Sequence, residues 1–376
     1  MRQIEMALRP MTLIENPAGK YADELRLFQG IPAVERTAKG RLWTAFYGCN
    51  TDGRNDENME NFVLVQSSDD DGFTWKKRMA VDMPGEAVRA YDPCLWIAPD
   101  GALWLFWGQT ACINRAGWSP TFDGRCGVWC AVCGDPDAAA PHFAAPRRIA
   151  NGVMMNKPTV THDGVWLLPC ALWHFVKNAV LDLPQERYSN VYASYDEGKT
   201  FELIGHADYK DRLIDEHMLV ERRDGSIWML IRARNGIGQA FSYDGGHTWE
   251  GESDTGWGGP CSRFFIRRLR SGRLVLVNHA DFTGRNNLTA FLSDDDGKTW
   301  QGGLLLDSRD GVSYPDGAED EKGNLYIIHD YERLGAREIL LSRVTEADIL
   351  AGKPVSEGSF LRRLVNKATG REKHCI

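Results

Sequence analysis

The chain has 376 residues, 43% of them hydrophobic, and a formal net charge of −8. This length is enough for a large buried core, and no apolar run is long enough to span a bilayer, so we expect a soluble globular protein. The negative charge argues against nucleic acid or an anionic membrane surface as a general partner. The start, residues 1–11, lacks the apolar core of a signal peptide. It predicts a cytoplasmic protein, or a secreted or periplasmic one whose signal has been removed.

Short strands separated by Asp-Gly and Ser-Gly turns follow one another along the chain, with almost no helical periodicity. This pattern is typical of an all-β meander. We expect the repeating units to be the blades of one β-propeller, in which residues 1–376 form a single domain and the N- and C-terminal segments close the ring. The expected blades are residues 28–78, 86–148, 152–204, 212–252, 260–303 and 312–345.

An eight-residue motif, S-x-D-x-G-x-T-W/F, occurs four times. Its copies are Ser68–Trp75, Ser194–Phe201, Ser242–Trp249 and Ser293–Trp300. The last three begin 48 and 51 residues apart, and a repeat of that size is the signature of a propeller or a solenoid. The aspartate can accept bonds from backbone N–H groups, the glycine supplies a positive φ, and the aromatic residue anchors the hairpin. We therefore expect the four aspartates to be structural.

The nine cysteines are an odd number, and their only cluster is Cys126, Cys130 and Cys133. In a strand, Cys130 and Cys133 point to opposite faces, and no second ligand pair has zinc spacing. The cluster favours buried structural thiols, and we expect neither a metal nor a cofactor.

Up-and-down strand order places the starts of the first strands, and the loops between second and third strands, at one mouth of the propeller. The Asp-Gly turns and the four motifs lie at the opposite face. Glu216 and Arg232 are nearly equidistant from the turn at 224–225, so they should face each other across a hairpin at the mouth. Arg285 lies where a mouth loop ends and a third strand begins, and Tyr314 lies at the start of the first strand of the last blade. Each residue alone suggests a salt bridge or a half-buried aromatic, but together they favour a site.

These motifs resemble those of the sialidase (neuraminidase) family of six-bladed propellers, whose repeat is called the Asp-box. The resemblance covers nearly the whole chain and rests on DEHMLVERRDGSIWMLIRAR, RNNLT from residue 285 and SYPD from residue 313. It implies that Glu216 is the catalytic glutamate, that Arg232 and Arg285 bind the substrate carboxylate, and that Tyr314 is the nucleophile. The family's acid/base aspartate lies on the mouth loop before the first Asp-box. The candidates there are Asp52, Asp56, Glu57 and Glu60, and the spacing to Ser68 favours Asp56.

One departure from the family concerns its opening Arg-Ile-Pro motif, which supplies the first carboxylate-binding arginine. Here the motif is Gly30-Ile31-Pro32. We expect another arginine to substitute, with Arg263 preferred for its distance from the turn at 271–272. Arg89, which precedes Tyr91-Asp92-Pro93, is second, and Asp92 joins it among the substrate-binding candidates. Arg36 should lie at the wrong end of its strand.

The resemblance implies an exo-α-sialidase that hydrolyses terminal sialic acids of a sialylated glycan or small sialoside with retention. A sialoside carries a carboxylate on its anomeric carbon, so a tyrosine hydroxyl approaches it without the repulsion that a carboxylate nucleophile would meet. Two alternatives stay open: a hydrolase or lyase of the same superfamily acting on another acidic sugar such as a rhamnosyl-uronate, and a non-catalytic glycan-binding propeller. The pair Tyr314 and Glu216 argues against both. His174, His217 and His279 keep the lyase open, although each fits a hydrogen-bonded mouth or core residue better.

Two long mouth loops, Thr110 to Cys126 and His174 to Ser189, belong to neighbouring blades. Long loops on a rigid scaffold tend to carry binding function. We expect them to overhang the site, with Trp118 as an apolar wall for the N-acyl or glycerol arm of the sugar. The alternative is that Trp118 only pins its own loop.

Overall fold

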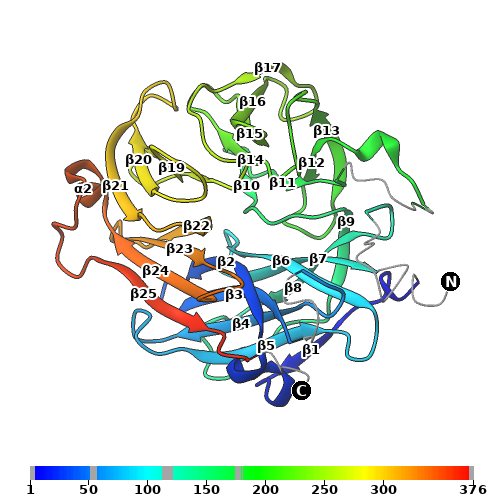
Figure 1. Cartoon of the computed structure of the whole chain (residues 1–376). Helices are drawn as coiled ribbons and strands as arrows, with labels where there is room; N and C mark the ends of the chain where they lie inside the picture. The colour runs from blue at the N-terminus through cyan, green and yellow to red at the C-terminus, as the bar shows by residue number, and fades with distance from the viewer. Residues whose placement is uncertain (1–4, 51–56, 112–121, 174–178, 180, 372–376) are drawn as a thin grey trace.

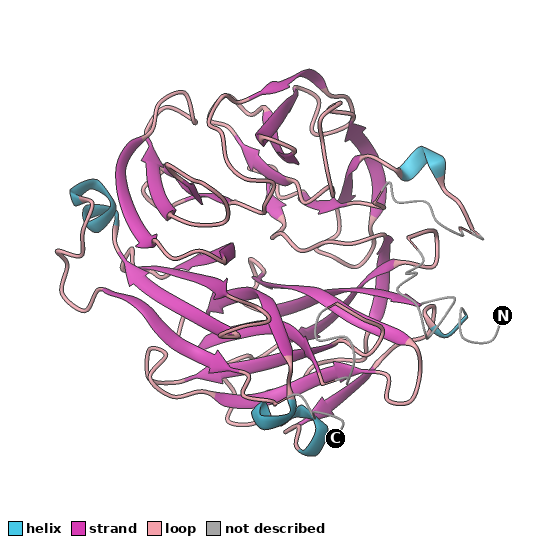
Figure 2. Ribbon diagram, viewed as in Figure 1, coloured by secondary structure: helices cyan, strands magenta, loops and turns pink. Residues whose placement is uncertain are grey.

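The structure, a computed structural model, describes residues 5–50, 57–111, 122–173, 179 and 181–371. Its strands form six separate sheets around a common centre (Figure 1), so the chain is an all-β six-bladed propeller. Figure 2 shows strands and loops with few helical turns, among them α2 (Glu346–Ala351). No helix in the described part of the chain has the length and hydropathy needed to cross a membrane.

The first three blades come from the N-terminal half of the chain. Blade 1 contains β1 (Thr12–Glu15), β2 (Phe28–Arg36), β3 (Leu42–Cys49), β4 (Phe62–Ser68) and β5 (Lys76–Asp82). Blade 2 contains β6 (Val88–Ile97), β7 (Leu103–Ala111), β8 (Gly127–Cys133) and β9 (Arg147–Asn151). Blade 3 contains β10 (Thr159–Val160), β11 (Trp166–Cys170), β12 (Ser189–Ser194) and β13 (Glu202–Ala207).

The last three blades follow in the same manner. Blade 4 contains β14 (Met218–Glu221), β15 (Ile227–Ala233), β16 (Gly236–Ser242) and β17 (Glu250–Asp254). Blade 5 contains β18 (Phe265–Arg268), β19 (Leu274–His279), β20 (Leu288–Ser293) and β21 (Gln301–Asp307). Blade 6 contains β22 (Val312–Glu319), β23 (Leu325–Tyr331), β24 (Glu338–Val344) and β25 (Phe360–Lys367).

Strand order along the chain is spatial order from the centre to the rim, as predicted, with two additions. In Figure 1 the labels of β2, β6, β10, β14 and β22 surround the centre. The first addition is β1, which pairs with β5 as a fifth, outermost strand of blade 1. The second is β25, which lies beyond residue 345 and completes blade 6. The predicted end of the last blade was therefore too early, because α2 and its loop separate the third and fourth strands.

The terminal segments meet at the junction between blades 1 and 6, as predicted. The Thr369 N–H donates to the Asp23 carbonyl at 2.8 Å, and the Gly370 N–H to the Arg26 carbonyl at 3.0 Å. Arg26 is fully buried and donates from Nη2 to Asn366 Oδ1 at 2.6 Å. The N- and C-terminal segments thus close the ring through hydrogen bonds between loops. Their strands, β1 and β25, belong to blades 1 and 6.

The four Asp-boxes share one hydrogen-bonding pattern. In the second, Ser194 Oγ donates to Asp196 Oδ1 at 2.9 Å and accepts from the Gly198 N–H at 2.8 Å. The Thr200 N–H and hydroxyl both donate to the Asp196 carboxylate. Gly198 has a φ of 81°, and Phe201 is half-buried against a core cluster. The carboxylates are occupied by their own turns, so their structural role is confirmed.

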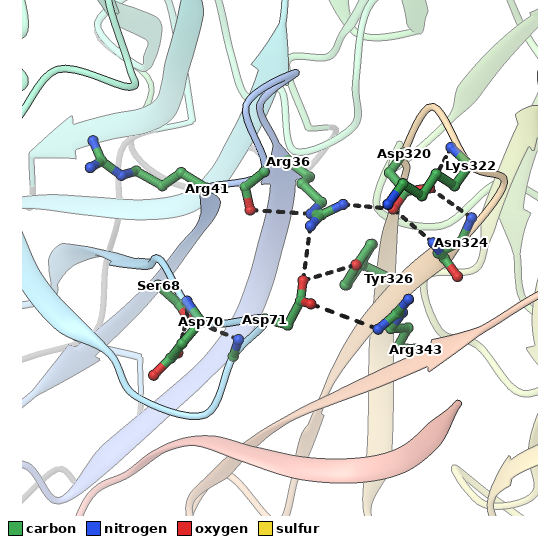
Figure 3. Close-up of polar contacts among 12 residues, drawn as sticks. Arg36, Arg41, Ser68, Asp70, Asp71, Asp320, Lys322, Asn324, Tyr326 and Arg343 are labelled. Atoms are coloured by element: carbon green, nitrogen blue, oxygen red, sulfur yellow. Dashed lines mark hydrogen bonds and ion pairs between the residues drawn. The ribbon is translucent and has the colours of Figure 1, made fainter. Parts of the chain in front are cut away.

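The face that carries the Asp-boxes also holds Arg36, as predicted. Figure 3 shows its guanidinium between two carboxylates of different blades. Nη1 contacts Asp320 at 2.6 Å and Nη2 contacts Asp71 of the first box at 2.9 Å. Arg36 therefore ties blade 1 to blade 6 at the end opposite the mouth.

The cysteine cluster consists of buried, unbridged thiols, as predicted. Cys130 and Cys133 lie in β8 and pack into two different core clusters, because alternate faces of the strand contact different neighbours. Within the described residues no group of three or more His, Cys, Asp and Glu side chains could hold a metal ion.

Candidate active site

Three inner strands carry the same local distortion at the mouth. Ile31 in β2, Asp92 in β6 and Tyr314 in β22 have φ of 55°, 48° and 54°, and each precedes a proline. The pairing register shifts at each of these points. A non-glycine residue in the left-handed region costs about 1–3 kcal/mol and is concentrated at functional sites. The distortions thus mark three of the inner strands whose starts lie at the mouth.

Tyr314, Glu216 and Arg232 form one buried cluster. The Tyr314 hydroxyl donates to Glu216 Oε1 at 2.8 Å and accepts from Arg232 Nη1 at 2.8 Å. The same Arg232 nitrogen lies 2.6 Å from Glu216 Oε2. The expectation that Glu216 and Arg232 face each other across the β14–β15 hairpin is confirmed by this ion pair. The Glu216 carboxylate is placed to accept the phenolic proton.

The electrostatics of Tyr314 reflect burial and charge together. Burial raises the pKa of Tyr314 well above its ordinary value, and Glu216 raises it further. Arg232, Arg333 and Arg285 oppose this rise. Tyr314 is therefore protonated at neutral pH, and any attack by its oxygen requires transfer of the proton to a base.

Arg285 reaches the cluster from blade 5. Its Nη2 donates to the Cys261 carbonyl at 3.1 Å, and Arg232 Nη2 donates to the same oxygen at 3.1 Å. The Arg285 guanidinium carbon lies 5.4 Å from the centre of the Tyr314 ring. The Cys261 carbonyl thus holds Arg232 and Arg285 next to each other beside Tyr314.

A second group of charges lies on the blade 1 and blade 2 side of the mouth. Asp92 is buried, and burial followed by the charge of Glu57 raises its pKa well above the usual range. Glu216 adds to this rise, whereas Arg89 and Arg333 oppose it. Arg89 is fully buried, with its guanidinium carbon 3.8 Å from the centre of the Tyr91 ring. Asp92 and Arg89 therefore lie at the mouth, and their binding of substrate stays a prediction.

Glu57, which follows the acidic stretch of the loop before the first Asp-box, reaches the same side of the mouth. Glu57 Oε2 lies 3.5 Å from Arg89 Nη2, whereas Glu60 is exposed. Asp52 and Asp56 lie outside the described residues, so the choice of Asp56 as acid/base stays a prediction. Trp118 and His174 also lie outside them.

Arg263 lies beside the Gly30-Ile31-Pro32 motif, where its Nη1 donates to the Pro32 carbonyl at 3.5 Å, and its role as the substitute arginine stays a prediction. Its Nε donates to Asn156 Oδ1 at 2.7 Å, and its Nη2 lies 3.4 Å from Asp316 Oδ1. Asp316 is two residues further along β22 than Tyr314, and it also pairs with buried Lys157 at 3.1 Å. Among the described residues no hydrogen bond or ion pair joins Arg263 to Tyr314, and the Arg263 guanidinium is held by Asn156 and Asp316.

Arg333 is the mouth residue that sequence reasoning missed. It lies on the loop between β23 and β24, with its guanidinium carbon 4.2 Å from the centre of the Tyr314 ring. Its place on a loop between a second and a third strand predicts that Arg333 lies at the mouth. Position 30 carries no arginine, and this is the one feature of the sequence that suggests a cation on this loop.

The remaining histidine candidates are held by backbone carbonyls. A His217 ring nitrogen lies 2.7 Å from the Asn190 carbonyl oxygen, and a His279 ring nitrogen lies 2.6 Å from that of Asn286. Burial lowers the pKa of His279 to about 4, which keeps its ring neutral. Both residues serve as buried supports, the second beside the loop that carries Arg285.

The sequence from residue 40 to 327 matches the family model of the BNR repeat-like domain. The chain belongs to this family. No curated protein matches it. Its fold is nevertheless shared by many solved structures, so this BNR repeat-like protein has a propeller fold that solved sialidase structures also have.

Three of these structures illustrate how similar the chain is to proteins of this fold. A Dyadobacter fermentans protein of unknown function is 16% identical with a TM-score of 0.63, over 87% of this chain and 95% of its own. A Hadza microbial sialidase is 18% identical with a TM-score of 0.67, over 87% and 67%. The intramolecular trans-sialidase from Ruminococcus gnavus, in complex with oseltamivir carboxylate, is 13% identical with a TM-score of 0.63, over 89% and 98%. At these identities the likeness establishes the fold alone.

Proposed function

We propose that this protein is an exo-α-sialidase that releases terminal sialic acids with retention of configuration. The observation that carries the proposal is the Tyr314 hydroxyl, which donates to Glu216 and accepts from Arg232, both at 2.8 Å. A glycan-binding propeller has no need of a buried nucleophile coupled to a base. Solved structures of sialidases and of a trans-sialidase with the same fold support the same class of substrate.

In the first step, the Tyr314 oxygen attacks the anomeric carbon while its proton passes to Glu216. The bond from the anomeric carbon to the leaving oxygen breaks, and that oxygen takes a proton from the acid, for which we propose Asp56. Arg232 and Arg285 hold the substrate carboxylate through charge-assisted hydrogen bonds. Burial raises the pKa of Tyr314, so the transfer to Glu216 is what makes its oxygen nucleophilic.

In the second step, water replaces the tyrosine. Asp56 accepts a proton from the water, whose oxygen attacks the anomeric carbon from the face that the leaving group vacated. The bond to the Tyr314 oxygen breaks, and that oxygen recovers its proton from Glu216. Two inversions give overall retention.

The test is hydrolysis of a fluorogenic sialoside beside a panel of uronate-linked oligosaccharides, with wild type and Tyr314→Phe. We expect the wild type to cleave the sialoside, and the variant to lose turnover by roughly 1000-fold or more while it still binds ligand. The phenylalanine keeps the ring and removes only the nucleophilic oxygen. Cleavage of the panel alone would replace the sialidase with an enzyme for another acidic sugar. Near-full turnover by the variant would remove Tyr314 from the nucleophile role.

A further inference from the structure

The side chain of Arg333 occupies the space beside Gly30. A Cβ atom built on Gly30 would lie 2.7, 2.8 and 2.9 Å from Cδ, Cγ and Nε of Arg333, closer than carbon atoms pack. The backbone of Gly30 is not in the left-handed region that favours glycine, since its φ is outside the positive range. What requires a glycine at position 30 is therefore the neighbouring arginine and not the conformation of β2.

The guanidinium of Arg333 is held in place by its own blade. Nε donates to Asp330 Oδ2 at 2.8 Å and Nη2 donates to Ser313 Oγ at 3.0 Å. Asp330 also accepts from the Ile31 N–H at 2.8 Å, which joins the support to blade 1. The side chain is 17% exposed, and Nη1 makes no hydrogen bond within the described part of the chain. One donor group is thus left for a ligand.

Arg333 also acts on the reacting tyrosine. Together with Arg232 and Arg285 it opposes the rise in the pKa of Tyr314, and it does so ahead of Arg285. The Arg333 guanidinium carbon is closer to the Tyr314 ring centre, at 4.2 Å, than that of Arg285, at 5.4 Å. Three arginines from blades 4, 5 and 6 therefore surround the tyrosine, and among the residues that the structure describes none comes from blade 1.

We propose that Arg333 supplies the carboxylate-binding cation that blade 1 lacks at Gly30. Position 30 is a glycine because the Arg333 side chain fills the space that a larger side chain there would occupy. This inference rests on the proposed function in assuming a carboxylate-bearing sugar. It assigns a specificity residue to the β23–β24 loop in place of the first inner strand.

The experiment measures binding of a thio-linked sialoside, which resists hydrolysis, and of its carboxylate methyl ester. The variants are Arg333→Ala and, as a control on the same loop, Leu334→Ala, whose side chain is 56% exposed. Arg333→Ala should weaken binding of the acid by roughly 10- to 100-fold and binding of the ester far less. Leu334→Ala should change neither. Equal weakening of acid and ester, or no change in either, would overturn the assignment.

A reciprocal exchange tests the shared space. Gly30→Arg alone should lose binding of the acid, because two arginine side chains compete for one site. Gly30→Arg combined with Arg333→Gly should recover a preference for the acid over the ester that Arg333→Gly alone lacks. A double variant no better than Arg333→Gly would contradict the claim that position 30 can supply the same cation.

Failure of the proposed sialidase function gives a different result from failure of the Arg333 assignment. If the wild type neither binds nor cleaves the sialoside but cleaves the uronate panel, the same comparison is made with a uronate-terminated oligosaccharide and its methyl ester. Loss of the preference for the acid in Arg333→Ala would then support Arg333 as the carboxylate ligand for that sugar. An unchanged preference would overturn the inference.

Discussion

The arginines beside Tyr314 are not equivalent, because their charges are balanced differently. Arg232 forms a buried ion pair with Glu216, and Arg333 pairs with Asp330. The Arg285 side chain has no carboxylate partner within the described residues, where it contacts the Cys261 carbonyl and the Tyr314 ring. A bound carboxylate would be the counterion of Arg285.

This difference predicts distinct effects of two substitutions. Arg285→Ala should lower kcat/KM by roughly 10- to 100-fold with little change in stability, because it removes a charge-assisted bond to the substrate. Arg232→Ala should also destabilise the fold by about 3–5 kcal/mol, because it leaves Glu216 buried without its partner. Urea unfolding and steady-state kinetics on both variants measure these effects. Equal stability losses would show that the ion pair of Arg232 is not the difference between them.

Among the structural elements, the link between blades 2 and 3 depends on one glycine. Gly152 follows β9 with a φ of 82°, and a Cβ atom there would lie 2.0 Å from the Ala171 carbonyl oxygen. The next residue, Val153, exchanges two backbone hydrogen bonds with Ala171, at 2.8 and 2.9 Å. The backbone of the two blades can approach this closely only where no side chain intervenes.

Gly152→Ala should therefore destabilise the protein by clearly more than Gly164→Ala. Gly164 has a similar φ of 83° but no atom within 4 Å of the added Cβ, so its replacement should cost only the backbone strain, about 1 kcal/mol. Thermal unfolding of the two variants measures the difference. Equal changes in Tm would mean that the contact with Ala171 relaxes at no cost.

The Asp-boxes predict a dependence of stability on pH. Hydrogen bonds from Thr200 lower the pKa of Asp196 to about 2, from an ordinary value of 3.8. A carboxyl group whose pKa is lower in the folded state contributes stability above its unfolded pKa and loses it as the pH falls through the folded value. The stability difference between wild type and Asp196→Asn should be constant from about pH 7 to 5 and shrink as the pH falls from about 4 toward 2. Urea unfolding over this range checks the expectation, and a difference independent of pH would contradict it.

For the whole molecule, the junction between blades 1 and 6 closes the ring and has contacts at both faces of the propeller. At the mouth it brings Arg333 to Gly30, and at the opposite face it holds Arg36 between Asp71 and Asp320 (Figure 3). Arg36 also lies over the Tyr326 ring at 4.9 Å. The two ends of the junction can therefore be perturbed separately.

Arg36→Ala should lower the free energy of unfolding by about 1–2 kcal/mol, the sum of two partly exposed ion pairs and one cation–π contact. It should leave kcat/KM unchanged, because Arg36 lies at the face opposite the mouth. Urea unfolding and kinetics on the same preparation test both statements. A large loss of kcat/KM in a folded variant would show that the junction transmits changes from one face to the other.

Sequence alone was enough for what depends on local spacing. The spacing of the repeated Asp-box predicts a propeller-like repeat architecture, because each copy closes one hairpin with its own hydrogen bonds. The equal distances of Glu216 and Arg232 from one turn predict that they meet, because antiparallel pairing places such residues opposite each other. Tyr314 was found through a motif at the start of a strand.

Tertiary structure alone decided which arginine stands beside Gly30. Distance from a turn predicts where Arg263 lies along blade 5 but not what its side chain contacts, and the structure shows it held by Asn156 and Asp316. Arg333 and Gly30 come from opposite ends of the chain and meet only where the last blade packs against the first. No periodicity within a blade encodes that contact, because it is made by side-chain packing between blades and appears only once the ring is closed.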